Sequence, residues 1–177
     1  MLATREQAAI VLREHTYYNT PLFSLKGKEG WVRLVDIYDG DTITIVLVVG
    51  GEVRRLQVRL AGIDTCEMRS KSMETRQLAI DAKASLLRFL TGLVLQSDDG
   101  SLRSRLNDGV YLVYCVFLEQ DKYGRTLANV YADDKKDLSA SNMLMHAGLA
   151  YAYGGKTKRS EEEQMRSIAL SGGLGTF

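Results

Sequence analysis

The chain has 177 residues, 45% of them hydrophobic, and its 23 lysines and arginines nearly balance 22 aspartates and glutamates, giving a net charge of +1. This length and composition suit one domain with a proper hydrophobic core. The near-neutral charge argues against a protein that holds polyanions by bulk charge alone, so a nucleic-acid partner would need a local basic patch or a metal ion.

The N-terminal stretch MLATREQAAIVLREH lacks the unbroken apolar segment behind a basic start that a secretory signal needs. No run approaches the about 18 apolar residues of a membrane span. We therefore expect an intracellular, cytoplasmic protein with no membrane partner. His15 and His146 are the only histidines, which argues against a histidine-built zinc site.

The first predicted element is a short helix over residues 4–14, because Thr4 and Gln7 form a capping-box pattern and apolar residues follow them. Residues 15–29 show no period and are expected to form a loop. We therefore divide the chain into an N-terminal extension, residues 1–29, and a domain over residues 30–177.

A β-hairpin is predicted next. The stretch WVRLVDIYDGDTITIVLVV, residues 31–49, is rich in β-branched residues and is broken by a turn signal at Asp39-Gly40. Gly50-Gly51 separates it from EVRRLQVRL, where apolar and polar side chains alternate. A hairpin centred on that turn places Asp41 opposite the neighbourhood of Leu60, with Asp64 just beyond the end of the strand.

More helices and strands follow in chain order. Ser72 caps a predicted helix that runs to about Leu90, and Gly92 is its stop signal. LVLQ, residues 93–96, is expected to begin a strand, and SDDGSLRSRLNDG, residues 97–109, is typical of a loop. VYLVYCVFLEQ and TLANVYA are predicted strands around the turn DKYGR. A helix over about 138–147 and a last helix from the Ser160–Glu163 capping box to near Gly172 complete the chain.

This order favours an α+β fold, a five-stranded OB-fold β-barrel with about three packed helices plus a short N-terminal helix. In that fold Asp41 and Asp64 converge at one end of the hairpin. Two carboxylates without a neutralising partner repel each other, so something cationic is expected between them. A hard divalent ion bound through oxygen atoms, Ca²⁺ or Mg²⁺, is the simplest answer.

Several stretches then resemble the staphylococcal nuclease (thermonuclease-like) family. They are DGDT at 39–42, RLAGIDTCE at 59–67, DKYGRTLANVYA at 121–132 and LMHAGLAYAY at 144–153. The resemblance covers roughly residues 31–172 and leaves out residues 1–29 and 97–109. It implies an OB-fold barrel that cleaves phosphodiester bonds of DNA and RNA, with Ca²⁺ as the cofactor.

The resemblance also implies residue roles. Asp41 and Asp64 would bind the metal, and the backbone carbonyl of Thr65 would add a ligand. Glu67 would be the general base that activates water, and the two phosphate-stabilising arginines would be Arg59 and Arg125. Substrate contacts are implied for Lys122, Tyr123, Tyr151 and Tyr153. The tyrosines could stack on bases, with phosphate contacts from the basic residues that follow them, Lys156, Lys158 and Arg159.

Each residue also has an ordinary structural explanation. Asp39-Gly40-Asp41 has the composition of a plain turn, and Asp64 could cap another. Arg59 could lie on a solvated strand face, and Glu67 and Arg125 could be exposed surface residues. The basic residues after Tyr153 could be a solvated segment.

Two features depart from the family pattern. Cys66 stands where the family usually has proline, which frees the loop, and we interpret it as a small buried filler rather than a reactive thiol. A disulfide with Cys115 is not expected in a chain with two cysteines and no sign of secretion. The insertion over residues 97–109 either alters the edge of the substrate groove or is a plain surface loop.

The leading hypothesis is a monomeric, calcium-dependent nuclease acting on DNA and/or RNA. The alternative is a catalytically inactive nuclease-like domain that binds nucleic acid or protein. A binding-only domain has little use for the full set of three carboxylates and two arginines. A plain OB-fold single-strand binder is disfavoured by the neutral total charge.

Overall fold

The computed structural model describes residues 4–95, 102–155 and 159–172. Five strands form a closed barrel, as the sequence predicts for an OB fold, and their order in it is β1-β2-β3-β6-β5. Their bounds are Glu29–Ile37 for β1, Thr42–Val49 for β2, Glu52–Leu60 for β3, Tyr111–Gln120 for β5 and Thr126–Tyr131 for β6. β3 and β6 pair in parallel and the other neighbours are antiparallel.

The predicted hairpin forms with its expected register. Gly50 and Gly51 have φ values of 60° and 80°, which suit a tight two-residue turn. Val49 pairs with Glu52 at the turn, and Thr42 pairs with Arg59 at the far end. Because the turn has two residues and no bulge interrupts this ladder, every pairing between the two ends is fixed by the turn.

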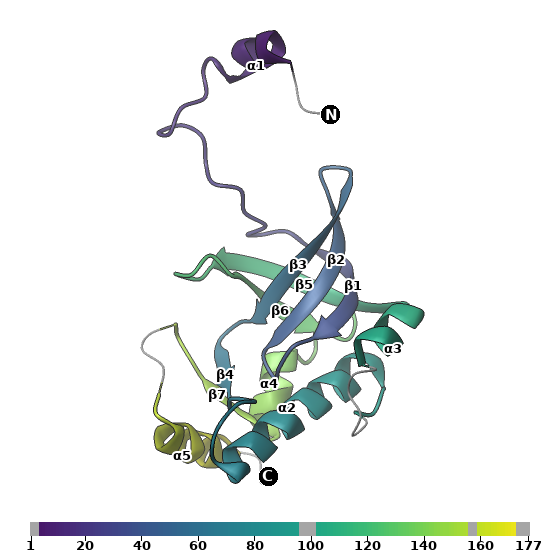
Figure 1. Ribbon diagram of the computed structural model, residues 1–177, viewed down its shortest axis with the longest axis vertical. Coiled ribbons are helices and arrows are strands. Elements are labelled where there is room, and N and C mark those ends of the chain that lie inside the picture. The colour runs from purple at the N-terminus through teal and green to yellow at the C-terminus, as the bar shows by residue number, and fades with distance from the viewer. Residues whose placement is uncertain (1–3, 96–101, 156–158, 173–177) are drawn as a thin grey trace.

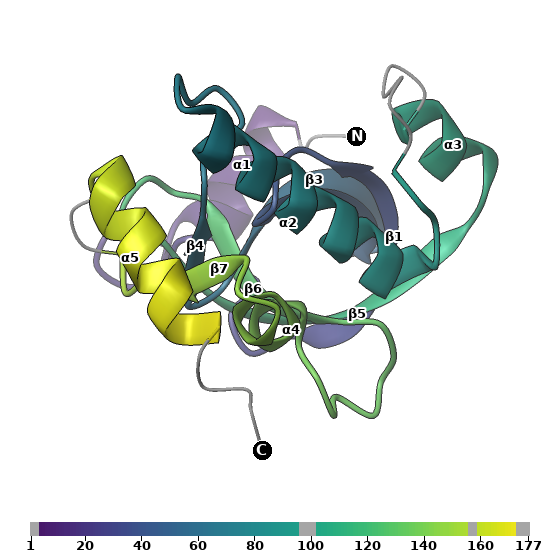
Figure 2. The ribbon, with the colours of Figure 1, turned by 90° about the horizontal axis from the view of Figure 1, so that it is seen from below.

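Helices close the end of the barrel below the hairpin (Figures 1 and 2). α2, Met73–Thr91, begins at the Ser72 cap and ends at Gly92 with φ 73°, as predicted. α4, Ala140–His146, and α5, Glu161–Gly172, are also confirmed, and Ser160 and Glu163 form the expected capping box. The inner faces of the barrel and of α2 and α4 share one apolar cluster that includes Leu34, Ile45, Leu86 and Leu144, all fully buried.

The N-terminal residues are arranged differently from the barrel. α1, Arg5–Leu12, has the predicted capping box between Thr4 and Gln7. None of its residues is buried, and Figure 1 shows it apart from the barrel at the end of an extended segment. Its apolar residues therefore add nothing to the core of the barrel.

Two sequence-based expectations are wrong. Residues 93–95 form no strand, and the polar insertion holds a helix, α3, Leu102–Asp108. Leu102 and Leu106, one helical turn apart, are buried in the main core and fix α3 against β1. The polar composition of the segment concealed this pair. Residues 97–101 of the expected loop lie outside the described residues.

A two-stranded sheet that the sequence reading missed lies beside the barrel. β4, Ile63–Thr65, pairs antiparallel with β7, Ala150–Ala152, and places Asp64 opposite Tyr151. Three residues are too few to show a period, so neither strand has a sequence signal of its own. Across the described parts of the chain, no helix has the length and apolar character needed to cross a membrane.

Candidate active site

The barrel brings residues from three parts of the chain to one end of the hairpin. The backbone N–H of Leu60 donates to the carbonyl oxygen of Asp41 at 2.8 Å, as the register requires. β6 begins beside the end of β3, with Thr126 opposite Val58, so Arg125 arrives at the same end. Closure of the barrel thus joins the open end of the hairpin, at Arg59, to the turn that holds Arg125, more than sixty residues later in the printed sequence.

A pocket of about 490 Å³ opens at this end. The pocket contains nearly all of the site residues expected from sequence, together with neighbours to which sequence reasoning gave no role in the site, among them Tyr38, Asp39, Thr42 and Gln57. Its lining is Tyr38, Asp39, Asp41, Thr42, Gln57, Arg59, Asp64, Thr65, Cys66, Glu67, Lys122, Tyr123, Arg125 and Tyr153. Gln57 shares a strand face with Arg59, so the alternation of β3 was the signal that could have found it.

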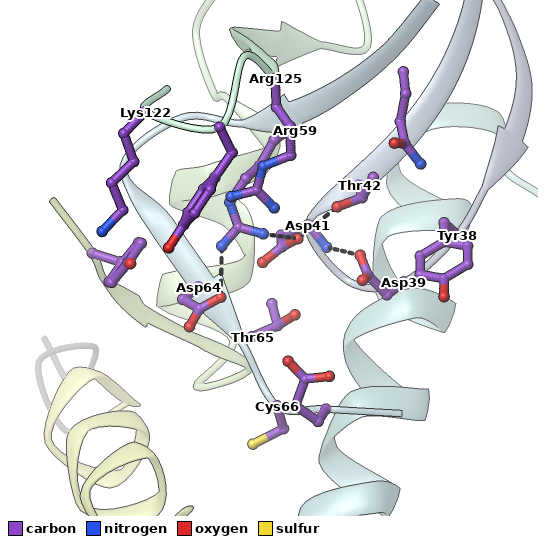
Figure 3. Close-up of a pocket in the computed structure, with 14 residues that line it drawn as sticks. Tyr38, Asp39, Asp41, Thr42, Arg59, Asp64, Thr65, Cys66, Lys122 and Arg125 are labelled. Atoms are coloured by element: carbon purple, nitrogen blue, oxygen red, sulfur yellow. Dashed lines mark hydrogen bonds and ion pairs between the residues drawn. The ribbon is translucent and has the colours of Figure 1, made fainter. Parts of the chain in front are cut away.

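Arg59 lies between the two aspartates (Figure 3). Its Nη1 donates to Oδ1 of Asp41 and its Nη2 to Oδ1 of Asp64, both at 2.6 Å. The exposed fraction is 9% for Arg59, 2% for Asp41 and 5% for Asp64. The alternative of a solvated Arg59 is therefore wrong. Between the two carboxylates, where the sequence favoured a divalent metal ion, this structure places the Arg59 guanidinium.

Negative charge is concentrated around Asp41. Burial raises the pKa of Asp41 to about 7, and the charges of Asp39 and Asp64 add to the rise, while Arg59 and Thr42 oppose it. One guanidinium faces three acidic groups, so it does not neutralise them all. Keeping these carboxylates ionised therefore costs free energy, and an additional bound cation would offset that cost.

The turn before β2 is packed too closely to be only a surface connection. A side chain at Gly40 would meet Cβ of Ala82 in α2 at 2.7 Å and the side chain of Thr65 at 3.0 Å. Asp39 also accepts a hydrogen bond from the backbone N–H of Asp41 at 3.1 Å. These contacts fix the position of Asp41 relative to β4, which carries Asp64.

The turn from β5 to β6 is organised by Asp121. Its Oδ1 accepts the backbone N–H groups of Tyr123 and Arg125 at 2.9 Å each, and its Oδ2 accepts Nε of Arg125 at 2.6 Å. Burial opposes ionisation of Asp121, but these hydrogen bonds outweigh it and lower its pKa. Asp121 therefore positions Arg125, a role that sequence reasoning missed although the two residues are four apart in one turn.

Lys122, Tyr123 and Arg125 form one basic wall of the pocket. The cationic groups of Lys122 and Arg125 lie 5.1 Å and 5.5 Å from the centre of the Tyr123 ring. Figure 3 places Lys122 and Arg125 on the opposite side of the view from Thr65 and Cys66. The pocket thus has a basic aromatic wall facing an acidic one.

The wall opposite, here called the acidic wall, is the segment at the end of β4, residues 65–67, whose acidic side chain is Glu67. Thr65 and Cys66 are buried, and Glu67 is exposed and lines the pocket. The backbone N–H of Ser70 donates to the carbonyl oxygen of Glu67 at 3.1 Å, and the Ser70 hydroxyl donates to Glu161 of α5 at 2.8 Å. These contacts hold the chain directly after Glu67 against α5.

Both cysteines are free, as expected. Burial raises the pKa of the Cys66 thiol to about 11, and the charges of Asp64 and Glu161 add to the rise. Burial alone raises the pKa of Cys115 to about 12. Both thiols are therefore protonated near neutral pH, which supports the interpretation of Cys66 as a buried filler.

The two tyrosines of the last motif have different surroundings. Tyr153 is half-buried and lines the pocket, with its ring 5.9 Å from the Arg59 guanidinium. Tyr151 has no exposed surface, and its hydroxyl donates to Oδ2 of Asp64 at 2.6 Å. Tyr151 therefore presents no ring face for the base stacking that the sequence suggested, because the pairing of β7 with β4 turns it inward.

Arg159, one of the basic residues that follow these tyrosines, does not line the pocket. The Arg159 guanidinium lies over the Tyr151 ring, 4.9 Å from its centre, and it also donates to Ser167. It therefore covers Tyr151 from outside. Lys156 and Lys158 lie outside the described residues.

The hydrogen bond from Tyr151 provides the first testable prediction. Burial and the contact with Asp64 raise the pKa of Tyr151 above its ordinary value, so the hydroxyl remains a donor. Tyr151→Phe is expected to lower the free energy of unfolding by about 1.5–3 kcal/mol, the usual value for a hydrogen bond to a charged group. Urea unfolding followed by circular dichroism measures this. Tyr18→Phe, at a position 94% exposed, is the matched control, and equal loss in both variants would contradict the prediction.

The donor atoms in the pocket fit a hard divalent cation. They include the carboxylates of Asp41 and Asp64, and Thr65, which also lines the pocket, carries only oxygen atoms as possible ligands. In the chain as described, no three His, Cys, Asp or Glu side chains gather in a metal-binding group. The protein would therefore supply few ligands, and Ca²⁺ accepts water and carbonyl oxygens in its remaining positions.

The fold and the pocket define an OB-fold protein with a carboxylate and arginine site at the open end of its hairpin. Residues 57–170 match the family model described as staphylococcal nuclease homologue, more than half of the chain, and the chain belongs to this family. A comparison with curated proteins found no match. Membership indicates a nuclease or nucleic-acid-binding protein.

The matched residues include most of the candidate site but not all of it. It contains Arg59, Asp64, Glu67 and Arg125, but it begins after Asp41. Asp41 joins the site through the hairpin register and through its ion pair with Arg59. The structure thus adds the second aspartate to a set that the family match alone leaves incomplete.

Proposed function

We propose that this protein is a calcium-dependent nuclease that hydrolyses phosphodiester bonds of DNA and/or RNA. The proposal is carried by one observation, the buried Arg59 held between Asp41 and Asp64 in a pocket that Glu67 and Arg125 also line. We assign this activity to residues 30–177 as one nuclease-like domain and regard residues 1–29 as an extension. A monomer is sufficient for it, because one chain supplies the whole pocket.

The two arginines would stabilise the phosphate. A phosphodiester anion repels an approaching nucleophile, and charge grows on its oxygens in the transition state. Arg59 and Arg125 offer planar, forked donors that match pairs of phosphate oxygens, which lysine cannot reproduce. The carboxylates that hold each arginine, Asp41 and Asp64 for Arg59 and Asp121 for Arg125, would fix the guanidinium planes before substrate arrives.

Glu67 would accept a proton from the attacking water. It is the exposed carboxylate of the acidic wall, so solvent and substrate reach it without movement of the core. Asp41, Asp64 and the Thr65 carbonyl would hold the cation. Bound Ca²⁺ would supply positive charge to the phosphate and favour ionisation of water.

Lys122, Tyr123 and Tyr153 would contact the nucleotide. Tyr123 is 70% exposed and can present its ring to a base or sugar, with Lys122 beside it for a phosphate. Tyr153 would limit the pocket near Arg59. Tyr151 would act as a positioning residue that orients Asp64 rather than as a contact to substrate.

Metal dependence is the second prediction and the direct test of the proposed function. Single-stranded DNA and RNA incubated with the protein and Ca²⁺ are expected to be cleaved, and chelator is expected to abolish cleavage because the carboxylates lose their cation. Fragment production on a denaturing gel measures this, and restoring Ca²⁺ should restore it. Binding of the DNA or the RNA without chelator-sensitive cleavage would instead support the alternative, a catalytically inactive domain that binds nucleic acid.

A further inference from the structure

The inserted helix α3 borders a second hollow on the outer face of the barrel. This hollow, of about 500 Å³, is lined by residues of β1, β2, β3 and α3. The lining is Val35, Asp36, Thr44, Val46, Arg55, Leu56, Gln57, Arg103 and Asn107. Two of the lining residues are basic, Arg55 on β3 and Arg103 on α3.

The hollow is continuous with the candidate active site. Arg55, Gln57 and Arg59 follow each other at every second position of β3, so they share one face of the sheet. Gln57 lines both the active-site pocket and the hollow. Four residues of strand span about 13 Å, so Arg55 lies beyond the immediate reach of the scissile phosphate but along a direct line from it.

α3 is firmly held at this place. Leu102 and Leu106 are buried in the main core. Arg33 of β1 donates to the carbonyl oxygens of Asn107 and Gly109 at 2.8 and 2.9 Å, and Asn107 donates to the carbonyl oxygen of Val35 at 3.0 Å. The helix is therefore a fixed wall of the hollow and not a loose surface loop.

The charged residues of the hollow suit the phosphate backbone of a nucleic-acid strand. Arg103 donates through Nε and Nη2 to Oδ2 of Asp36, yet its side chain is 74% exposed, against 15% for Asp36. An ion pair at such an exposed guanidinium contributes little, so a phosphate can compete for it or share it. Arg55 adds a second exposed guanidinium, and Thr44, Gln57 and Asn107 add neutral hydrogen-bonding groups.

We propose that this hollow is an extended subsite for the nucleic-acid strand, in which Arg55 and Arg103 bind backbone phosphates away from the cleaved bond. The inference rests on the proposed function for its substrate class. It assigns the insertion a role in gripping long strands over short ones. Because phosphate contacts read no base sequence, the subsite would raise affinity and leave sequence preference unchanged.

The test compares long and short substrates with an Arg55→Ala, Arg103→Ala double variant. A long single-stranded oligonucleotide is expected to bind about tenfold more weakly or worse than to the wild type, while kcat/KM for a dinucleotide is unchanged. The slope of log affinity against log salt should fall in magnitude by about 1.4, because each lost phosphate contact contributes about 0.7 on a single strand. An Arg13→Ala, Arg166→Ala variant removes the same charge from exposed positions away from the hollow.

A second variant is expected to change binding in the opposite direction. Asp36→Asn removes the acid that pairs with Arg103 and is expected to tighten binding of the long strand. Fluorescence anisotropy in chelator measures binding without cleavage, so the subsite is tested even if the wild type cleaves nothing and the proposed nuclease activity fails. Wild-type affinity and salt slope in the double variant, or equal losses in the Arg13→Ala, Arg166→Ala control, would overturn the subsite.

Discussion

Arg59→Ala is expected to lower kcat at least about a hundredfold, because it removes a fixed donor from the developing phosphate charge. The same change leaves Asp41 and Asp64 buried with no cation between them. Breaking a buried ion pair by removing one partner costs about 3–5 kcal/mol of unfolding free energy, and here two carboxylates lose their partner. The loss of stability in chelator should therefore be among the largest for any single site in the chain.

Calcium should reverse part of that loss of stability but none of the loss of rate. An added cation can replace the charge of the guanidinium between the carboxylates, whereas it cannot replace its hydrogen bonds to phosphate. Urea unfolding with Ca²⁺ and with chelator measures the first effect, and cleavage of a dinucleotide measures the second. Arg59→Lys should retain more stability than Arg59→Ala while remaining slow, because lysine keeps the charge and loses the fork.

Arg54→Ala is the matched control for both measurements. Arg54 is on the same strand, its side chain is 62% exposed, and it pairs with Glu52 at the surface. Its loss is expected to change stability by less than about 1 kcal/mol, as for other surface pairs. An Arg59→Ala protein as stable and as active as Arg54→Ala would contradict the central role of the Arg59 bridge.

Glu67→Gln is expected to reduce kcat by about 10²–10⁴, the usual contribution of general acid–base catalysis, with little change in KM. Glutamine keeps the size and polarity of the side chain but does not accept the proton from water. Because Glu67 is exposed and outside the buried Arg59 bridge, the stability and the calcium affinity of the variant should match the wild type.

Glu74→Gln provides the control for charge removal near the same loop. Glu74 is an exposed residue in the first turn of α2, and it does not line the pocket. Single-turnover cleavage separates the chemical step from substrate binding, and titration calorimetry with Ca²⁺ checks the metal site. Full activity in Glu67→Gln would assign the proton to another acceptor, and equal slowing in Glu74→Gln would attribute the effect to general charge.

Much of the fold was accessible from local patterns. The capping boxes at Thr4 and Ser160 and the stop at Gly92 predicted helix ends that the structure confirms. Those signals work because the residues that form them are within a few positions of each other. α3 was missed because its two buried leucines lie in an otherwise polar segment, and only the barrel surface beside them makes their spacing meaningful.

For the candidate site too, the sequence predicted some features and missed others. The register from Gly50-Gly51 was enough to predict that Asp41 and Asp64 approach each other and that a cation is required between them. The identity of that cation in the folded chain, the Arg59 guanidinium, depended on which way the side chain turns at the end of β3. The inward position of Tyr151 likewise depended on the pairing of β4 with β7, which the sequence reading missed.

The sequence by itself determined most strand and helix positions along the chain, the hairpin register and the set of residue types suited to phosphodiester chemistry, because these follow from short-range periodicity, turn residues and spaced motifs. Only the tertiary structure decided which of those side chains are buried, which pair with one another, and that the inserted helix stands beside the outer face of β3. Burial and pairing depend on contacts between residues distant in the chain, and those contacts exist only once the barrel has closed.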